Sequence, residues 1–182
     1  MSSLPPSSHA LLASLRAAFS GRMVSDPAGM APWLRDYRQR WGGPALAVVQ
    51  PDSTADVAAV VRWCVEHDAV VVPQGGNTGL TGASVPLGVP LSRLPSGAPP
   101  ASADKAPSDA PDPSQARTTG GADVQPRPVI LLSLSRMQQV RSVDALASTM
   151  VVEAGCTLQG AQEAAAAHGR LFPLSLASEG SC

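Results

Sequence analysis

The sequence predicts an α+β fold built on a small parallel β-sheet. A strand pattern, a helix pattern and a second strand pattern follow one another between residues 45 and 73, and this order is typical of a crossover that joins parallel strands. Further strand patterns at 129–133 and 149–153 extend the mixture. With 182 residues, the chain is long enough for one ordinary domain.

The first strand and helix have clear boundaries. Ala45–Val49 is a short apolar run that ends at Pro51. Ser53 is suited to cap the following helix, because Asp56 stands at its third position. We expect this helix to end near Asp68 and to bury one stripe of apolar residues at helical spacing, namely Val57, Val60, Val61, Cys64 and Val65.

The later elements follow the same logic. Ala69–Val72 is a β-branched run, which we expect to pair in parallel with the first strand. Val129–Ser133 and Thr149–Glu153 are predicted as further strands. Thr157 can cap a last helix, and Gly169 is expected to close it in the left-handed conformation.

Composition divides the chain into an N-terminal helical segment, 1–44, and a longer unit, 45–182, that residues 88–128 interrupt. The interruption holds nine of the 18 prolines and no aromatic residue, so we expect a disordered insertion in a surface loop. In the N-terminal segment, Trp33, Tyr37 and Trp41 share one face of a predicted helix, which favours a packing face over a stacking site for a base or flavin.

Charge and cysteine content exclude several classes of protein. The net charge of −1 and the absence of a basic stripe argue against nucleic-acid binding. No apolar run is long enough to cross a membrane. The three cysteines and three histidines are scattered, which argues against a disulfide framework or a metal site and indicates a reducing compartment.

Residues 1–25 have some features of a mitochondrial transit peptide, although a capping helix of the domain is favoured.

The residues best suited to bind a ligand form the run PQGGNTGLTGAS, residues 73–84, directly after a predicted buried strand. Glycines allow the backbone to approach a ligand closely, and consecutive N–H groups can then form a concave anion site. Hydroxyl and amide side chains add further donors. The run contains no lysine or arginine, so a diphosphate held by uncharged main-chain amides is the expected ligand.

Other interpretations of this run are weaker. A Walker loop requires a lysine, and Lys105 lies far away in the predicted insertion. The dinucleotide fingerprint requires a helix after the glycines, whereas Pro86 and the insertion follow here. A glycine-rich hairpin turn without a ligand also stays open.

The run VVVPQGGNTGLTGASVP resembles the flavin diphosphate loop of FAD-linked oxidases in the vanillyl-alcohol oxidase and p-cresol methylhydroxylase (PCMH) superfamily. Within it, the chain resembles most the branch of D-lactate and D-2-hydroxyglutarate dehydrogenases and glycolate oxidase subunits. Three further segments agree in order and spacing: 45–73, VILLSLSRM at 129–137, and 151–182. The resemblance implies a PCMH-type FAD-binding domain, with the start of a second, antiparallel subdomain after the parallel sheet.

Carried over position by position, the resemblance implies two groups of cofactor-binding residues. The first would wrap the FAD diphosphate and the second would lie near the flavin ring or ribityl chain; they are Gly75, Gly76, Asn77, Thr78, Gly79, Leu80, Gly82 and Ser84, and then Pro173, Gly180 and Ser181. Relatives with covalent flavin often carry histidine where this chain has Asn77, so non-covalent FAD is implied. Gln74 replaces a frequent arginine and Ala83 a frequent glycine.

For a complete protein, the resemblance implies oxidation of a D-2-hydroxy acid to a 2-oxo acid by hydride transfer to flavin N5. A quinone, a cytochrome or an electron-transfer flavoprotein would accept the electrons. The chain itself resembles a fragment that ends before the family's substrate domain, so its catalytic residues are unknown. The alternatives are a non-catalytic flavin-binding remnant and an oxidase of a sugar or alcohol. The expected location is cytoplasmic, with a membrane-peripheral position or, in a eukaryote, the mitochondrion also open.

Overall fold

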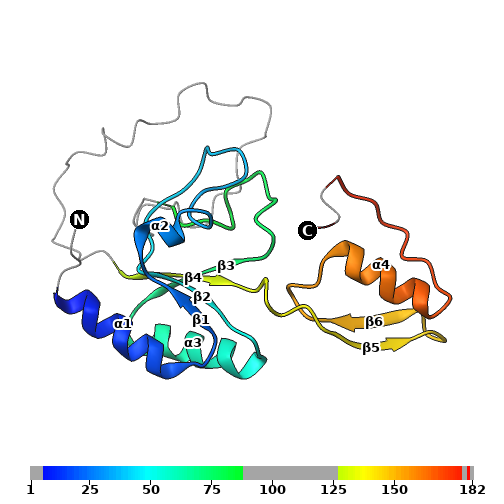
Figure 1. Ribbon diagram of the computed structural model, residues 1–182, viewed down its shortest axis with the longest axis horizontal. Coiled ribbons are helices and arrows are strands. Elements are labelled where there is room, and N and C mark those ends of the chain that lie inside the picture. Colours follow the sequence, from blue (N-terminus) through cyan, green and yellow to red (C-terminus); the bar gives the residue numbers. More distant parts are fainter. Residues whose placement is uncertain (1–5, 88–126, 178–179, 181–182) are drawn as a thin grey trace, which may run out of the picture.

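The computed structural model describes residues 6–87, 127–177 and 180. The predicted insertion therefore lies, apart from Arg127 and Pro128, outside the described residues, as does Ser181. The described chain forms two α+β units (Figure 1). This confirms the predicted fold class, whereas the domain division at residue 45 stays a prediction.

The larger unit is a four-stranded sheet in the order β1-β2-β4-β3. Strands β2 (Ala47–Gln50), β3 (Val70–Gln74) and β4 (Val129–Ser133) are parallel, and β1 (Arg22–Val24) pairs antiparallel with β2 at the edge. The expected direct pairing of the first two predicted strands is wrong, because β4 lies between them. Four of the five residues of β4 are buried, and such a continuously apolar strand is stable only when both neighbours and both faces cover it.

Two helices, α1 (Pro6–Ala18) and α3 (Thr54–Glu66), cover one face of this sheet (Figure 1). The core on that face joins Leu15 of α1 and Trp63 of α3 to Val49 and Ile130 of the sheet. Trp63 also donates from Nε1 to Ser14 Oγ over 3.0 Å. The sheet is therefore closed on this face by helix packing.

The predicted cap of α3 is confirmed. Ser53 Oγ accepts a hydrogen bond from the backbone N–H of Asp56 and donates one to its carboxylate. The helix ends at Glu66, with His67 as its C-cap. Asp68 then has a φ of 48°, so the left-handed residue turns the chain into β3.

The opposite face carries a smaller core and the segment after the short helix α2 (Pro27–Met30) (Figure 1). The predicted helix over residues 33–41 is wrong: these residues form turns, with one isolated bridge between Arg35 and Gly42. The carboxylate of Asp36 accepts hydrogen bonds from the N–H groups of Arg38, Arg40 and Trp41. A side chain that binds these amides competes directly with helix formation.

The predicted aromatic packing face therefore does not form as expected. Trp33 is half-buried and packs against the core of this face. Tyr37 is 75% exposed and Trp41 is 48% exposed. Of the three aromatic residues, only Trp33 packs against a hydrophobic core of the sheet.

The second unit consists of the antiparallel hairpin β5 (Val140–Asp144) and β6 (Thr149–Val152) and the helix α4 (Leu158–Ala167). Thr157 caps α4 by accepting from the N–H of Gly160. Gly169 closes the helix with a φ of 65°, as predicted. The strands β1 and β5 were not foreseen, because neither is a continuous apolar run.

Polar contacts join the two units at the start of α3. Arg136, just after β4, forms an ion pair with Asp52. Arg141 of β5 donates to Thr54 Oγ1 over 2.8 Å and pairs with Glu153 at 3.2 Å. These contacts hold the hairpin beside the sheet.

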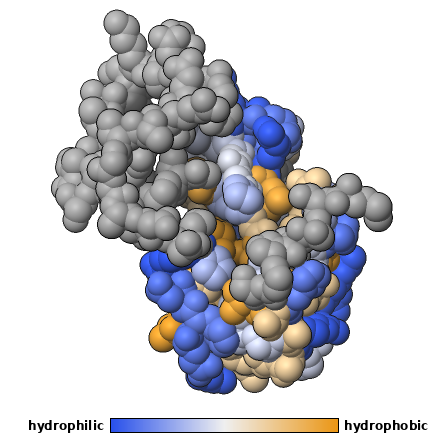
Figure 2. All heavy atoms as spheres, turned by 90° about the vertical axis from the view of Figure 1, so that its left-hand side faces the viewer, coloured by the Kyte–Doolittle hydropathy of each residue, from blue (hydrophilic) through white to orange (hydrophobic). Residues whose placement is uncertain are grey.

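Among the described residues, no helix has the length and apolar content needed to cross a membrane. In the face drawn in Figure 2, hydrophilic residues surround several separate hydrophobic areas.

We predict that Leu131→Ala lowers the free energy of unfolding by about 2–5 kcal/mol, because a fully buried side chain of the central strand leaves a cavity. Urea denaturation of the purified protein measures this loss. Val61→Ala on α3 is the control and should cost less than about 1 kcal/mol, because this side chain is 40% exposed and its expected place in the buried stripe is wrong, as is that of Val65 at 78%. Equal losses would contradict the assignment of β4 to the core.

Candidate functional site: a cradle at the carboxyl edge of the sheet

The glycine-rich run begins at the carboxyl edge of the parallel strands. Strands β2, β4 and β3 end at Gln50, Ser133 and Gln74, and all three of these polar side chains are buried. The residues from Gly75 to Ser84, called here the glycine loop, leave the sheet at this edge. In open parallel sheets, ligands bind outside the carboxyl ends of the strands.

The main chain of the glycine loop has many free donors. None of the backbone N–H groups from Gly75 to Ala83 has a hydrogen-bond acceptor among the residues that the structure describes. A Cβ placed on Gly75 or Gly79 would meet open space. Asn77 and Gly82 have positive φ angles of 55° and 74°, which turn the loop. Amides of this kind can line a concave site for an anion.

The side chain of Gln74 fixes the base of the loop. Gln74 is 2% exposed, and its Nε2 donates to the carbonyl oxygens of Trp33 and Ser84, both over 2.9 Å. The bond to Ser84 closes the loop across its two ends. Gln74, noted in the sequence only as the substitute for an arginine, is therefore a structural residue.

The side chains of Asn77 and Ser84 also form hydrogen bonds within the protein. Asn77 Nδ2 donates to the Arg35 carbonyl over 2.7 Å, and Asn77 Oδ1 accepts from Ser84 Oγ over 3.0 Å. We infer that these two residues contribute to a ligand site through their main chain. Thr78 and Thr81 keep hydroxyl groups without a partner among the described residues.

Sequence reasoning missed the segment that supports the loop. The residues from Trp33 to Gly42, called here the arginine segment, include Arg35, Arg38 and Arg40. The ring of Trp41 lies so close to Gly82 that a Cβ on that glycine would be 2.6 Å from Trp41 Cγ. The contact joins positions 41 residues apart, and no local pattern encodes it.

The carboxylate of Asp36 fixes the backbone of the arginine segment through hydrogen bonds to its N–H groups. Its side chain is 1% exposed. The backbone N–H of Trp41, followed by those of Arg38 and Arg40, lowers the pKa of Asp36 below its ordinary value, although burial partly opposes the shift. Asp36 is therefore an ionised carboxylate whose charge is directed to main-chain donors.

The second predicted group of cofactor residues lies on the other unit. Pro173 and Gly180 are both exposed, and a Cβ on Gly180 would be 3.5 Å from Gln159 Oε1 of α4. Gln162 Nε2 donates to the Leu174 carbonyl over 2.7 Å, which holds this segment along the helix. Among the described residues, no hydrogen bond joins either position to the glycine loop, so their role stays a prediction.

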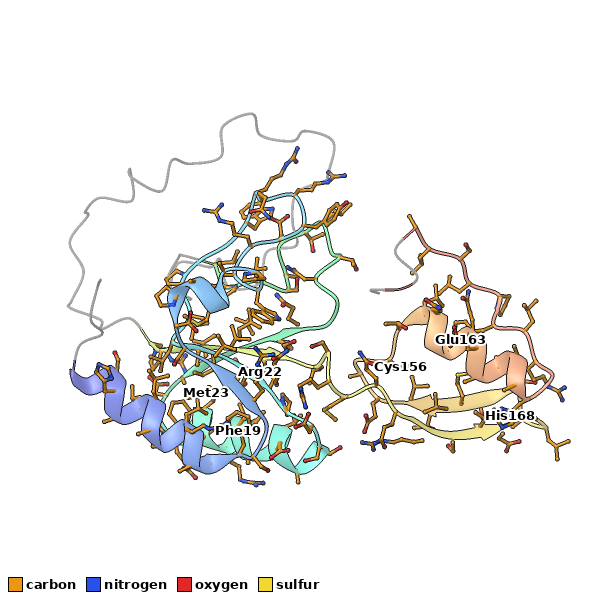
Figure 3. All side chains as sticks on the ribbon, in the orientation of Figure 1. Phe19, Arg22, Met23, Cys156, Glu163 and His168 are labelled. Atoms are coloured by element: carbon orange, nitrogen blue, oxygen red, sulfur yellow. The ribbon has the colours of Figure 1, made fainter. Side chains whose placement is uncertain are left out.

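The described residues contain no cluster of His, Cys, Asp and Glu that could hold a metal ion. Cys156 and His168 lie at opposite ends of α4, away from Phe19 and from Met23 of β1 (Figure 3). Burial raises the pKa of the Cys64 thiol to about 11, so this cysteine is an inert core residue. Among the described residues, the arrangement places unpartnered main-chain donors at the glycine loop and shows no cluster of these titratable side chains.

A sequence model of the FAD binding domain family matches residues 45–94 and 114–182. The chain belongs to this family. The match includes the glycine loop, β4 and the whole second unit, so it covers both predicted groups of cofactor residues.

Curated relatives agree with the family assignment. The chain is 29% identical to D-2-hydroxyglutarate dehydrogenase, mitochondrial, from Bos taurus over 94% of its own length and 24% of the relative's. It is 29% identical to D-2-hydroxyglutarate dehydrogenase from Xanthomonas citri pv. viticola over 88% of its length and 26% of the relative's. The chain thus spans about a quarter of the length of these relatives.

Solved structures share the fold. An alkyldihydroxyacetonephosphate synthase superposes with a TM-score of 0.61 at 15% identity, over 92% of this chain and 26% of that one. A substrate-bound p-cresol methylhydroxylase gives a TM-score of 0.56 at 15% identity, over 91% and 26%. This confirms the predicted PCMH-type architecture.

FAD is the cofactor of this family, and the residues present fit it. The diphosphate of FAD brings acceptor oxygens without donors, which match the unpartnered amides from Gly75 to Ala83. The open space at Gly75 and Gly79 lets a ligand approach the main chain. At the same edge, Gln50 Oε1 is buried without a hydrogen-bond donor among the described residues.

We predict that Gly82→Ala weakens FAD binding and lowers stability by about 1–2 kcal/mol, because an L-residue is strained at a positive φ and Trp41 blocks the new Cβ. Gly79→Ala is the matched control for stability, since its Cβ would enter open space in the protein without FAD. Thermal unfolding of both variants without FAD measures the effect on stability, and FAD titration of Gly82→Ala measures the effect on binding. Equal losses of stability in the two variants would show that the contact with Trp41 does not shape the loop.

We also predict a pH-dependent stability difference between the wild type and Asp36→Ala. Because the folded protein lowers the pKa of Asp36, its stabilising contribution is complete above the ordinary pKa and is lost as the pH falls through the folded-state value. Denaturant unfolding at several pH values should therefore show a difference that is largest near neutrality and shrinks in acid. A difference independent of pH would contradict this role.

Proposed function

We propose that this chain supplies the diphosphate-binding part of a flavin-dependent oxidoreductase that oxidises a D-2-hydroxy acid to a 2-oxo acid. The observation that carries the FAD part is the row of unpartnered amides in the glycine loop, within a chain of the FAD binding domain family. The substrate class is supported by the relatives that are named D-2-hydroxyglutarate dehydrogenase and D-lactate dehydrogenase.

The residues of this chain hold and orient the cofactor. We infer that Gly75, Gly76, Thr78, Gly79, Leu80 and Gly82 surround the diphosphate, with Asn77 and Ser84 bracing the loop. Non-covalent binding follows from Asn77, whose carboxamide is no nucleophile and whose two ends are already hydrogen-bonded. Bound FAD supplies two-electron oxidation of the substrate α-carbon.

We assign proton transfer and electron transfer to other parts of the longer protein. Among the described residues, titratable groups of the metal-binding or nucleophilic types do not gather in one place, so we assign no catalytic acid or base to this chain. The electron acceptor that we propose is a quinone, a cytochrome or an electron-transfer flavoprotein. The compartment, the cytoplasm or a mitochondrion, stays a prediction.

The test is anaerobic reduction of the full-length, FAD-loaded protein. We expect D-2-hydroxyglutarate or D-lactate to bleach the visible flavin absorbance, while their L-enantiomers leave it unchanged. A full-length protein that takes up no FAD after reconstitution would contradict the cofactor proposal. Bleaching by sugars or simple alcohols alone would contradict the proposed substrate class.

A further inference from the structure

The charge of an FAD diphosphate has no cationic partner within the glycine loop, which contains neither lysine nor arginine. Such a ligand carries two negative charges, and charge-assisted hydrogen bonds are stronger than neutral ones. A diphosphate held only by main-chain N–H groups would lack charge-assisted hydrogen bonds from cationic side chains. The neighbouring arginine segment has the charges that the loop lacks.

Three contacts place the arginine segment against the loop. The carboxamides of Gln74 and Asn77 donate to its carbonyl oxygens, and Trp41 packs on Gly82. These contacts come from both ends of the segment and from both the start and the end of the loop. The two pieces of chain are therefore braced together at the same edge of the sheet.

The outward charge of this segment is positive. Arg35, Arg38 and Arg40 are exposed, whereas the carboxylate of Asp36 is buried and bound to main-chain N–H groups. In the part of the chain that the structure describes, Arg38 and Arg40 form no ion pair and their guanidinium groups make no hydrogen bond. By contrast, Arg127, Arg136 and Arg141 each have an acidic partner.

An aromatic face accompanies these charges. The side chain of Trp41 rests on the backbone of Gly82 and still leaves 48% of its surface exposed. Exposed tryptophan beside a main-chain anion site is suited to stack on a base or a flavin ring, because such contacts are sequence-independent and bury large apolar area.

We propose that the arginine segment is the second wall of the FAD site, in which Arg38 and Arg40 provide positive charge to the diphosphate and Trp41 provides a stacking face. This inference rests on the proposed FAD binding and adds residues that lie outside the sequence motif. The two arginines are binding residues and have no part in the redox chemistry.

The experiment compares FAD binding by the full-length protein with that of Arg38→Gln/Arg40→Gln. Glutamine keeps the backbone N–H groups that bind Asp36, so the fold should be retained, which the melting temperature checks. We expect the dissociation constant of FAD to rise about tenfold and its salt dependence to flatten. Competition by ADP, which carries the diphosphate, should weaken in parallel, while riboflavin, which carries none, should bind unchanged.

The matched control is Arg62→Gln, which removes an exposed arginine from α3 on the opposite face of the sheet. It should leave both FAD affinity and its salt dependence unchanged. If the wild type binds FAD and the double variant binds it equally well, the inference is overturned while the proposed function stands. If the double variant instead loses only electron transfer to an acidic protein acceptor, the arginines serve a protein partner and the inference is likewise overturned.

Discussion

The buried carboxamide of Gln74 determines where the glycine loop leaves the sheet and what lies beside it. Its two donor bonds, to Trp33 and Ser84, connect the end of β3 to the end of the loop and to a segment 41 residues earlier. Burying an amide without a hydrogen-bond partner lowers stability. The carbonyl oxygens of Trp33 and Ser84 are therefore held within hydrogen-bond distance of the Gln74 side chain. These two bonds fix the ends of the loop without using its own N–H groups, which remain available to a ligand.

The sheet makes this arrangement possible. Because β4 lies between β2 and β3, the carboxyl ends of three parallel strands form one continuous edge. Helices cover one face, and the arginine segment occupies the other face at that edge. The ligand site therefore combines a loop encoded by a single motif with a wall brought from a distant part of the chain.

The second unit is joined to the sheet mainly by polar contacts. Arg136 and Arg141 reach the residues at the start of α3, and the N–H of Gln139, followed by Arg141, lowers the pKa of Glu153. Arg136, Asp52 and Arg141 are about half exposed, so salt screens their attraction, whereas the Glu153 side chain is 8% exposed. The orientation of the hairpin thus depends on a few polar groups, in contrast to the apolar packing that closes the sheet.

Local signals determined a large part of the protein. The caps at Ser53 and Thr157, the left-handed Gly169 and the buried strand β4 follow from short-range stereochemistry and hydrophobic pattern. The glycine loop and its position after a strand were also evident from the sequence, as was the FAD binding domain family. In each case the information lies within a few neighbouring residues.

Only the tertiary structure decided the strand order, the edge strand β1 and the place of the arginine segment beside the glycine loop. The non-helical course of that segment is a local effect that the helical spacing of its three aromatic residues does not record, because Asp36 binds the amides of residues that closely follow it. By contrast, the packing of Trp41 on Gly82 depends on two chain segments meeting across the sheet edge. Contacts between distant segments arise when the whole core is buried, and no periodicity within either segment records them.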